Sequence, residues 1–183
     1  MKKQILFIHS AGPQGNDQGS NDLVAFLQEA CGADYNIIHP KMPDSENPIY
    51  ELWREQLKNE IELLDGHVIL IGHSLGGSVL LKYLSEEGCR LHISGLITIA
   101  APYWGKDDNW QREDFTLSED FASNLARIAQ LVMYHSRNDE IVPFAHVEHY
   151  AKNLPQAIIR ALEGGAHLFH EGIHELIKDI RSL

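Results

Sequence analysis

The chain has 183 residues, and its 15 Lys and Arg against 26 Asp and Glu give a formal net charge of −11. A negative field of this size disfavours nucleic acid and anionic membranes as partners, and no apolar run approaches the about 18 residues that span a bilayer. The 44% hydrophobic and 22% charged residues are ordinary for a soluble protein, so residues 1–183 are expected to form a single cytoplasmic domain.

Six short apolar runs, rich in Ile, Leu and Val, alternate along the chain with longer amphipathic segments. Runs of this kind suit strands that are buried on both faces of a parallel sheet, and the alternation predicts helices on both sides of that sheet. The expected fold class is therefore α/β, with a doubly wound sheet of about six mostly parallel strands. The expected strands are Ile5–His9, Tyr35–His39, His67–Gly72, Gly95–Ala100, Leu131–His135 and Ala157–Leu162.

The first clear helix signal lies between the second and third runs. Asn47 is a favourable cap and Pro48 suits the first helical position, so a helix is predicted to begin there. Apolar side chains then recur at helical spacing on one face. They are Trp53, Leu57, Ile61 and Leu64.

Two further helices are predicted later in the chain. One covers Leu75–Glu86 and ends before Gly88, a normal left-handed terminator. The last lies near Glu171–Arg181 and should bury Ile173, Ile177 and Ile180. The two cysteines, Cys31 and Cys89, are too few and too far apart for a disulfide framework, and both are expected to be reduced and buried.

A G-x-S-x-G motif, formed by residues 72–76, directly follows the third predicted strand. In open α/β sheets, ligands bind beyond the carboxyl ends of the strands, which is where this motif falls. The pattern is typical of a nucleophile elbow, a strained strand-to-helix turn in which side chains at Gly72 and Gly76 would collide with neighbouring backbone. Ser74 is therefore the predicted nucleophile, and the predicted fold is a single-domain α/β-hydrolase with no large cap domain.

The partners of such a serine follow it in the order Asp or Glu, then His. Asp139 lies in the polar turn after the fifth predicted strand, with Glu140 as the second choice for the acid. His167 follows the last predicted strand in a glycine-flanked loop, which distinguishes it among the 11 histidines. His167 would take the proton of Ser74, while Asp139 would fix the tautomer of His167 and stabilise its charged form.

An oxyanion hole needs backbone donors that are fixed before the reaction. The N–H of Leu75, directly after the nucleophile, is the first expected donor. The second should come from the loop after the first strand, where Ala11 is favoured and Ser10 is the next choice. Pro13, in the same loop, has no N–H to donate.

Further motifs extend over most of the chain: His9–Gly12, Met42–Asp44, the helix around Trp53, Gly72–Gly77, Asn138 and Asp139 with Val142 and Pro143, and Gly165–His167 with His174–Ile177. In these stretches the chain resembles the retinoblastoma-binding serine hydrolase family. The resemblance implies a small lid-free α/β-hydrolase with a triad of Ser74, Asp139 and His167. That family often has His-Gly after the first strand, where this chain has His9 and Ser10, so the second oxyanion donor stays open.

A rival motif, H-E-x-x-H, covers residues 170–174 and is the signature of a zinc hydrolase. Zinc needs a third protein ligand, and the extended form of the motif would need Gly and His where the chain has Ile177 and Ile180. Gly172 would also weaken the helix. The favoured interpretation is the exposed start of the last helix. His146 and His149 are likewise predicted on an exposed helix face.

The motifs together predict a serine hydrolase that cleaves carboxylic esters through an acyl-enzyme, with thioesters and amides left open. It would need no cofactor, and its partner would be a small acyl substrate. The loop Ala101–Ser118 is the expected entrance, where Tyr103, Trp104 and Trp110 either line an acyl pocket or pack the loop. The alternative is a binding protein on an inactive hydrolase scaffold.

Overall fold

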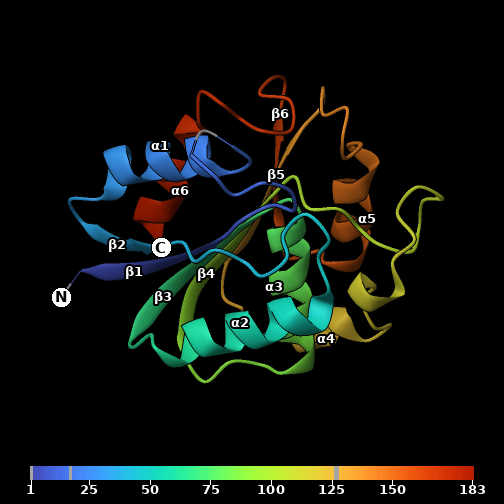
Figure 1. Cartoon of the computed structure of the whole chain (residues 1–183), viewed down its shortest axis with the longest axis horizontal. Helices are drawn as coiled ribbons and strands as arrows, with labels where there is room; N and C mark the ends of the chain where they lie inside the picture. The colour runs from blue at the N-terminus through green and yellow to red at the C-terminus, as the bar shows by residue number, and fades with distance from the viewer. Residues whose placement is uncertain (1, 17, 126–127) are drawn as a thin grey trace.

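The computed structural model of the protein describes residues 2–16, 18–125 and 128–183. Its six strands form one parallel sheet in the order β2-β1-β3-β4-β5-β6 (Figure 1). The predicted α/β sheet is confirmed, and every strand is parallel to its neighbours. The strands are β1 (Lys3–Ile8), β2 (Tyr35–Ile38), β3 (His67–His73), β4 (His92–Ile99), β5 (Leu131–Ser136) and β6 (Ile158–Leu162).

Helices cover both faces of the sheet. Helices α1 and α6 lie on one face, and α2 to α5 lie on the other (Figure 1). A 3-10 turn, η1 (Glu113–Phe115), lies in the connection from β4 to α4. The helices are α1 (Asn21–Cys31), α2 (Tyr50–Glu62), α3 (Leu75–Glu86), α4 (Phe121–Leu125), α5 (Ala145–Asn153) and α6 (His174–Ser182).

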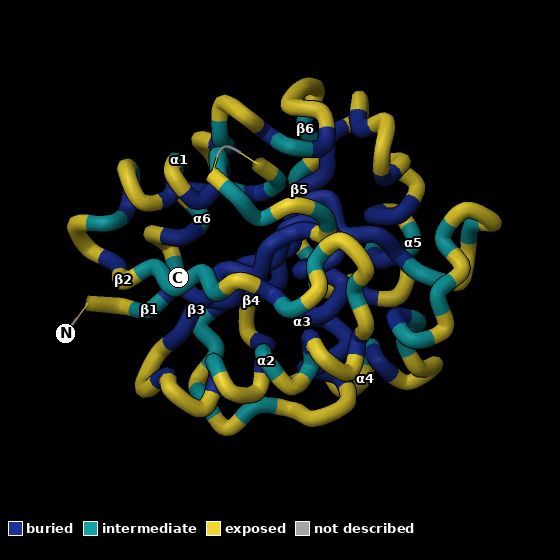
Figure 2. Tube along the Cα trace, in the orientation of Figure 1, coloured by how far each residue is buried: buried dark blue, intermediate teal, exposed yellow. Residues whose placement is uncertain are grey.

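The alternation of side chains along the strands divides the interior into two cores. In β1, Ile5 and Phe7 face the core under α1 and α6, while Leu6 and Ile8 face the core that contains Trp53 of α2. The tube of Figure 2 is accordingly dark along the middle of the sheet. The prediction of strands buried on both faces holds for these inner strands, but the edge strand β6 is only partly covered.

Helix α2 begins at Tyr50, later than the predicted start at Asn47 and Pro48. The reason is local, because the N–H of Asn47 donates to the carbonyl of Asp44 in a turn and Ile49 is extended. The predicted apolar face is nevertheless correct. Trp53, Leu57, Ile61 and Leu64 are all buried, although Leu64 lies just beyond the helix.

Helix α3 has the predicted bounds, and Gly88 beyond it is left-handed with φ of 69°. Helix α6 begins at His174 and not near Glu171, because Gly172 has φ of 74° and Ile173 is extended. Cys31 is buried and free, whereas the free thiol of Cys89 is partly exposed, which corrects the prediction for that residue. None of the helices in the described ranges is both long enough and apolar enough to cross a membrane.

Candidate active site

Ser74 lies on the sharp turn between β3 and α3, with φ of 52° and ψ of −120°. An L residue rarely adopts this conformation, and the surroundings hold it. A Cβ on Gly72 would lie 2.5 Å from the amide nitrogen of Gly77, and one on Gly76 would collide with the carbonyl of Ile8. The predicted steric role of the two glycines is confirmed, because no side chain at either position could fit this turn.

The structure brings together the three residues that the motif order selected. The Nε2 atom of His167 lies 3.0 Å from the Oγ of Ser74, and its Nδ1 lies 2.8 Å from the Oδ2 of Asp139. All three residues are at least nine-tenths buried. Each comes from a different loop at the carboxyl end of the sheet, after β3, β5 and β6. A hydrogen-bonded path therefore connects the serine hydroxyl with a buried carboxylate.

The carboxylate of Asp139 is held on its other side by backbone. Its Oδ1 accepts hydrogen bonds from the N–H groups of Ile141 and Val142, at 2.9 and 2.8 Å. Burial alone would raise the pKa of Asp139, but the hydrogen bond and charge of His167 and these two amides outweigh burial and lower it. Glu140, the second choice for the acid, has an exposed side chain. Asp139 is therefore ionised at neutral pH and oriented toward His167.

The candidate oxyanion donors are not equally free. Leu75 begins α3, where a helix has no acceptor of its own for the N–H. The N–H of Ser10 donates to the Oγ of Ser20 at 2.9 Å, so the structure corrects the suggestion that it could serve as the second donor. Within the described part of the chain, no hydrogen bond uses the N–H of Ala11. Ala11 therefore remains the predicted second donor.

A cavity of about 370 Å³ opens beside Ser74 and His167. The loop between β4 and α4 contributes Trp104 and Trp110 to its wall, so these two side chains line a cavity beside the serine. Tyr103 is not part of that wall; it is buried among other aromatic rings, 4.7 Å from the ring of Tyr150. The other large apolar residues of the wall are Pro13, Pro48, Leu75, Pro102, Phe115, Ile141 and Leu168.

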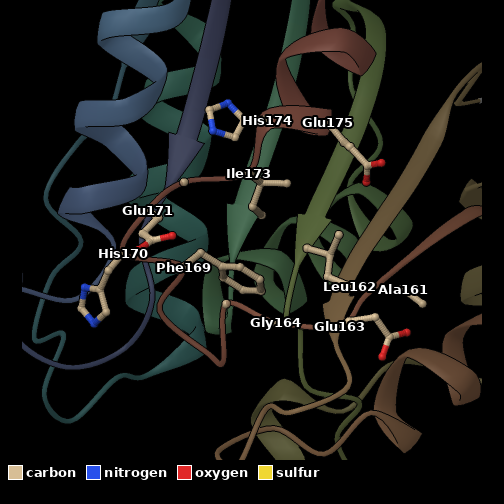
Figure 3. Close-up of a pocket in the computed structure, with 12 residues that line it drawn as sticks. Ala161, Leu162, Glu163, Gly164, Phe169, His170, Glu171, Ile173, His174 and Glu175 are labelled. Atoms are coloured by element: carbon tan, nitrogen blue, oxygen red, sulfur yellow. The ribbon is translucent and has the colours of Figure 1, made fainter.

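The H-E-x-x-H residues line part of a separate cavity of about 760 Å³, and residues 161–165, Phe169 and Glu175 line the rest (Figure 3). His170 lies in a turn and bonds to Asp22, while His174 begins α6 with its ring against Phe26. With the left-handed Gly172 between them, the two imidazoles do not share a helical face, which the zinc interpretation requires. Over the ranges that the structure describes, no three His, Cys, Asp or Glu side chains are grouped to hold a metal ion.

Two buried histidines near the site were not singled out by the sequence. Burial lowers the pKa of His73 to about 3 and that of His9 to about 4. His146, predicted on an exposed face, is also buried, and its Nδ1 accepts the N–H of Tyr103. The x of G-x-S-x-G carries no pattern of its own, so only the alternation along β3 could have indicated that His73 faces inward.

These buried histidines predict a loss of stability in mild acid. The unfolded chain binds protons on His9 and His73 below about pH 6.5, whereas the folded chain does not until near pH 4 and 3. The stabilising effect is therefore present above pH 6.5 and is lost as the pH falls. At pH 5.0 we expect the free energy of unfolding in urea to be lower by about 2 kcal/mol per histidine than at pH 7.5. A His9→Asn variant should show a smaller pH dependence than the wild type. Equal free energies of unfolding of the wild type at pH 5.0 and pH 7.5 would contradict the prediction.

Comparisons with known proteins bear on the family and the fold. A family model described as serine hydrolase matches residues 19–181. YdeN of Bacillus subtilis (strain 168) is 25% identical over 180 residues, which cover 96% of this chain and 92% of the relative. The crystal structure of that gene product has a TM-score of 0.84 at 21% identity and covers 99% of this chain and 98% of its own.

Two more distant structures share the fold. Mouse alpha/beta hydrolase domain-containing protein 10 has a TM-score of 0.69 at 19% identity, covering 98% of this chain and 88% of its own. A structure from a study of carboxylesterases of the thaumarchaeon Nitrososphaera gargenis has a TM-score of 0.72 at 13% identity, covering 99% and 89%. These likenesses establish the predicted α/β-hydrolase fold. The narrower resemblance to the retinoblastoma-binding family rests on the sequence motifs alone.

Proposed function

The chain belongs to the serine hydrolase family, and we propose that it cleaves carboxylic esters through an acyl-enzyme on Ser74. The observation that carries this proposal is the continuous hydrogen-bonded path from the Ser74 hydroxyl through His167 to Asp139, with contacts of 3.0 and 2.8 Å. A serine hydroxyl is a weak nucleophile until an adjacent base removes its proton. The path supplies that base, and the carboxylate at its far end orients it.

The proposed reaction follows from the direction of these bonds. The Ser74 Oγ attacks the ester carbonyl while its proton passes to the Nε2 of His167, and the charged imidazole then protonates the departing alcohol. Water enters, gives a proton to His167 and attacks the acyl carbon, and the proton returns to the Ser74 oxygen as the carboxylic acid leaves. Asp139 holds the Nδ1–H throughout. In each half of the cycle His167 therefore acts first as the base and then as the acid.

The oxygen that becomes negative in each tetrahedral intermediate needs preorganised donors. We assign the N–H of Leu75, at the first position of α3, and the N–H of Ala11, both of which line the cavity beside Ser74. The N-terminus of α3 adds a favourable dipole at this position. A negative oxygen would therefore be stabilised where the hydroxyl of Ser74 attacks.

The cavity favours an apolar acyl group of modest size. Its volume of about 370 Å³ is near the lower end of the range for small-molecule sites. The rings of Trp104 and Trp110 lie 5.0 Å apart, and the Arg112 guanidinium in the same wall is paired with Asp114 at 2.8 Å. An acyl chain would therefore meet aromatic surface and a neutralised charge. The carboxylesterases of Nitrososphaera gargenis share this fold, which makes esters the first substrates to test.

Covalent labelling tests the proposal directly. A fluorophosphonate probe should attach to Ser74, as located by intact mass and peptide mapping, and Ser74→Ala should abolish the adduct. Ser85→Ala, which removes another buried hydroxyl in α3, should leave the labelling unchanged. A series of p-nitrophenyl esters with matched thioesters and anilides then determines the substrate class. A folded protein that neither labels nor turns over would instead indicate a binding protein on an inactive scaffold.

A further inference from the structure

His73 is the last residue of β3, directly before Ser74, but it takes no part in the proposed proton path. Its side chain is fully buried. Its Nε2 lies 2.8 Å from the backbone carbonyl oxygen of His167, and its Nδ1 lies 2.8 Å from the Oγ of Ser20. Both ring nitrogens therefore have partners, one in the loop after β6 and one directly before α1.

The chemistry of the partners fixes where each proton lies. A carbonyl oxygen can only accept, so the Nε2 of His73 carries a hydrogen and donates it to His167. Burial keeps the ring neutral, since it lowers the pKa of His73 to about 3. The Nδ1 of a neutral ring with a protonated Nε2 can only accept, and the hydroxyl of Ser20 therefore donates to it.

Ser20 extends this chain to the loop after β1. With its own hydrogen committed to His73, the Oγ of Ser20 accepts the N–H of Ser10 at 2.9 Å and lies 3.1 Å from the hydroxyl of Ser10. The N–H of Ser10 precedes that of Ala11, the proposed second oxyanion donor. One directed chain thus runs from the Ser10 amide through Ser20 and His73 to the peptide carbonyl of His167.

We propose that His73 is a positioning residue, which holds the His167 backbone so that its imidazole reaches Ser74 and Asp139, and which through Ser20 orients the Ser10–Ala11 segment. This inference rests on the proposed function. Burying an imidazole is costly unless both nitrogens are paired, and an aliphatic side chain would fill the same space without that cost. The rings of His73 and His167 also lie 5.2 Å apart, so a shift in one loop is transmitted to the base.

Two conservative variants separate the two ends of the chain. In His73→Gln the amide nitrogen is as many bonds from Cβ as Nε2 of histidine, so it can still donate to the carbonyl of His167. In His73→Asn the side-chain amide matches the place of Nδ1 and can keep only the contact with Ser20. His73→Leu removes both contacts at similar volume. The matched control is Ser85→Ala, which deletes a buried hydroxyl bonded only within α3.

We expect kcat for a p-nitrophenyl ester to fall about 10- to 100-fold in His73→Leu with KM little changed, because a small displacement of the base affects the chemical step more than binding. His73→Gln should recover most of the lost kcat, His73→Asn less, and Ser20→Ala should cause a smaller loss. In the double variant His73→Leu with Ser20→Ala, the two losses in kcat should not multiply, because both residues belong to one hydrogen-bonded chain. Ser85→Ala should keep the wild-type kcat.

The possible results distinguish this inference from the function on which it depends. A wild-type protein that neither labels at Ser74 nor hydrolyses esters overturns both. An active wild type whose folded His73→Leu variant keeps kcat overturns only the positioning role. Equal loss in His73→Gln and His73→Leu, or independent losses from His73 and Ser20, also overturns it. Should His73→Leu fail to fold, the comparison of His73→Gln, His73→Asn and Ser20→Ala decides the same question.

Discussion

His167→Ala is expected to lower kcat/KM for a p-nitrophenyl ester by about 10⁴- to 10⁶-fold, the range seen when a serine hydrolase loses its base. The imidazole of His167 is the group 3.0 Å from the Ser74 hydroxyl, and without it the attacking oxygen keeps its proton. Turnover should be measured with the purified variant, together with circular dichroism and a melting curve. The residual rate should resemble that of Ser74→Ala, because the two groups act as one unit.

His174→Ala is the matched control for this loss. His174 lies only seven residues beyond His167, in the segment that spells H-E-x-x-H. It is the first residue of α6, and its exposed ring packs against Phe26 of α1. The variant should keep turnover within a few-fold of wild type, and a chelator should have no effect. Chelator-sensitive activity that survives His167→Ala, or its loss in His170→Ala and His174→Ala, would refute the serine mechanism and support the zinc interpretation.

The elements that the sequence located well are those with a short-range physical cause. The apolar runs identified all six strands, because a strand in the middle of a parallel sheet is apolar on both faces. The glycines at 72 and 76 identified the elbow, because the backbone there leaves no room for a Cβ. Asp139 and His167 were selected by their order after the serine and by their place in the loops that follow the last two strands, since the carboxyl ends of parallel strands meet at one edge of the sheet.

The features that sequence reasoning missed depend on contacts between distant segments. Nothing in the sequence around Ser20 or His73 indicates that these two side chains, 53 positions apart in the chain, form a hydrogen bond. The same is true of Ser10, whose N–H is taken by Ser20, and of Tyr103, which packs against Tyr150 instead of lining the cavity. The late start of α2 has a local cause, a turn that uses the N–H of Asn47, but helix caps and turns favour the same residues.

Asp139→Asn should leave the fold intact and lower kcat by about 10⁴-fold, the size of loss that replacing the triad aspartate by asparagine causes in a serine protease. The amide keeps the size of the carboxylate, and its oxygen can still accept the N–H groups of Ile141 and Val142. Its NH₂ group would then face the Nδ1 of His167 as a donor. That contact favours the tautomer with hydrogen on Nε2, which cannot take the proton of Ser74.

Glu140→Gln provides the control, because Glu140 is the neighbouring acid and has an exposed side chain. It should keep nearly full activity, and the opposite pattern, loss in Glu140→Gln with wild-type turnover in Asp139→Asn, would show that the acid is wrongly assigned. The pH gives a second check. Since the pKa of Asp139 is held below its ordinary value, the wild-type carboxylate stays charged at neutral and mildly acidic pH. The deficit of Asp139→Asn should therefore persist from pH 5 upward wherever both proteins remain folded, because no proton taken up or released in that range restores the lost charge.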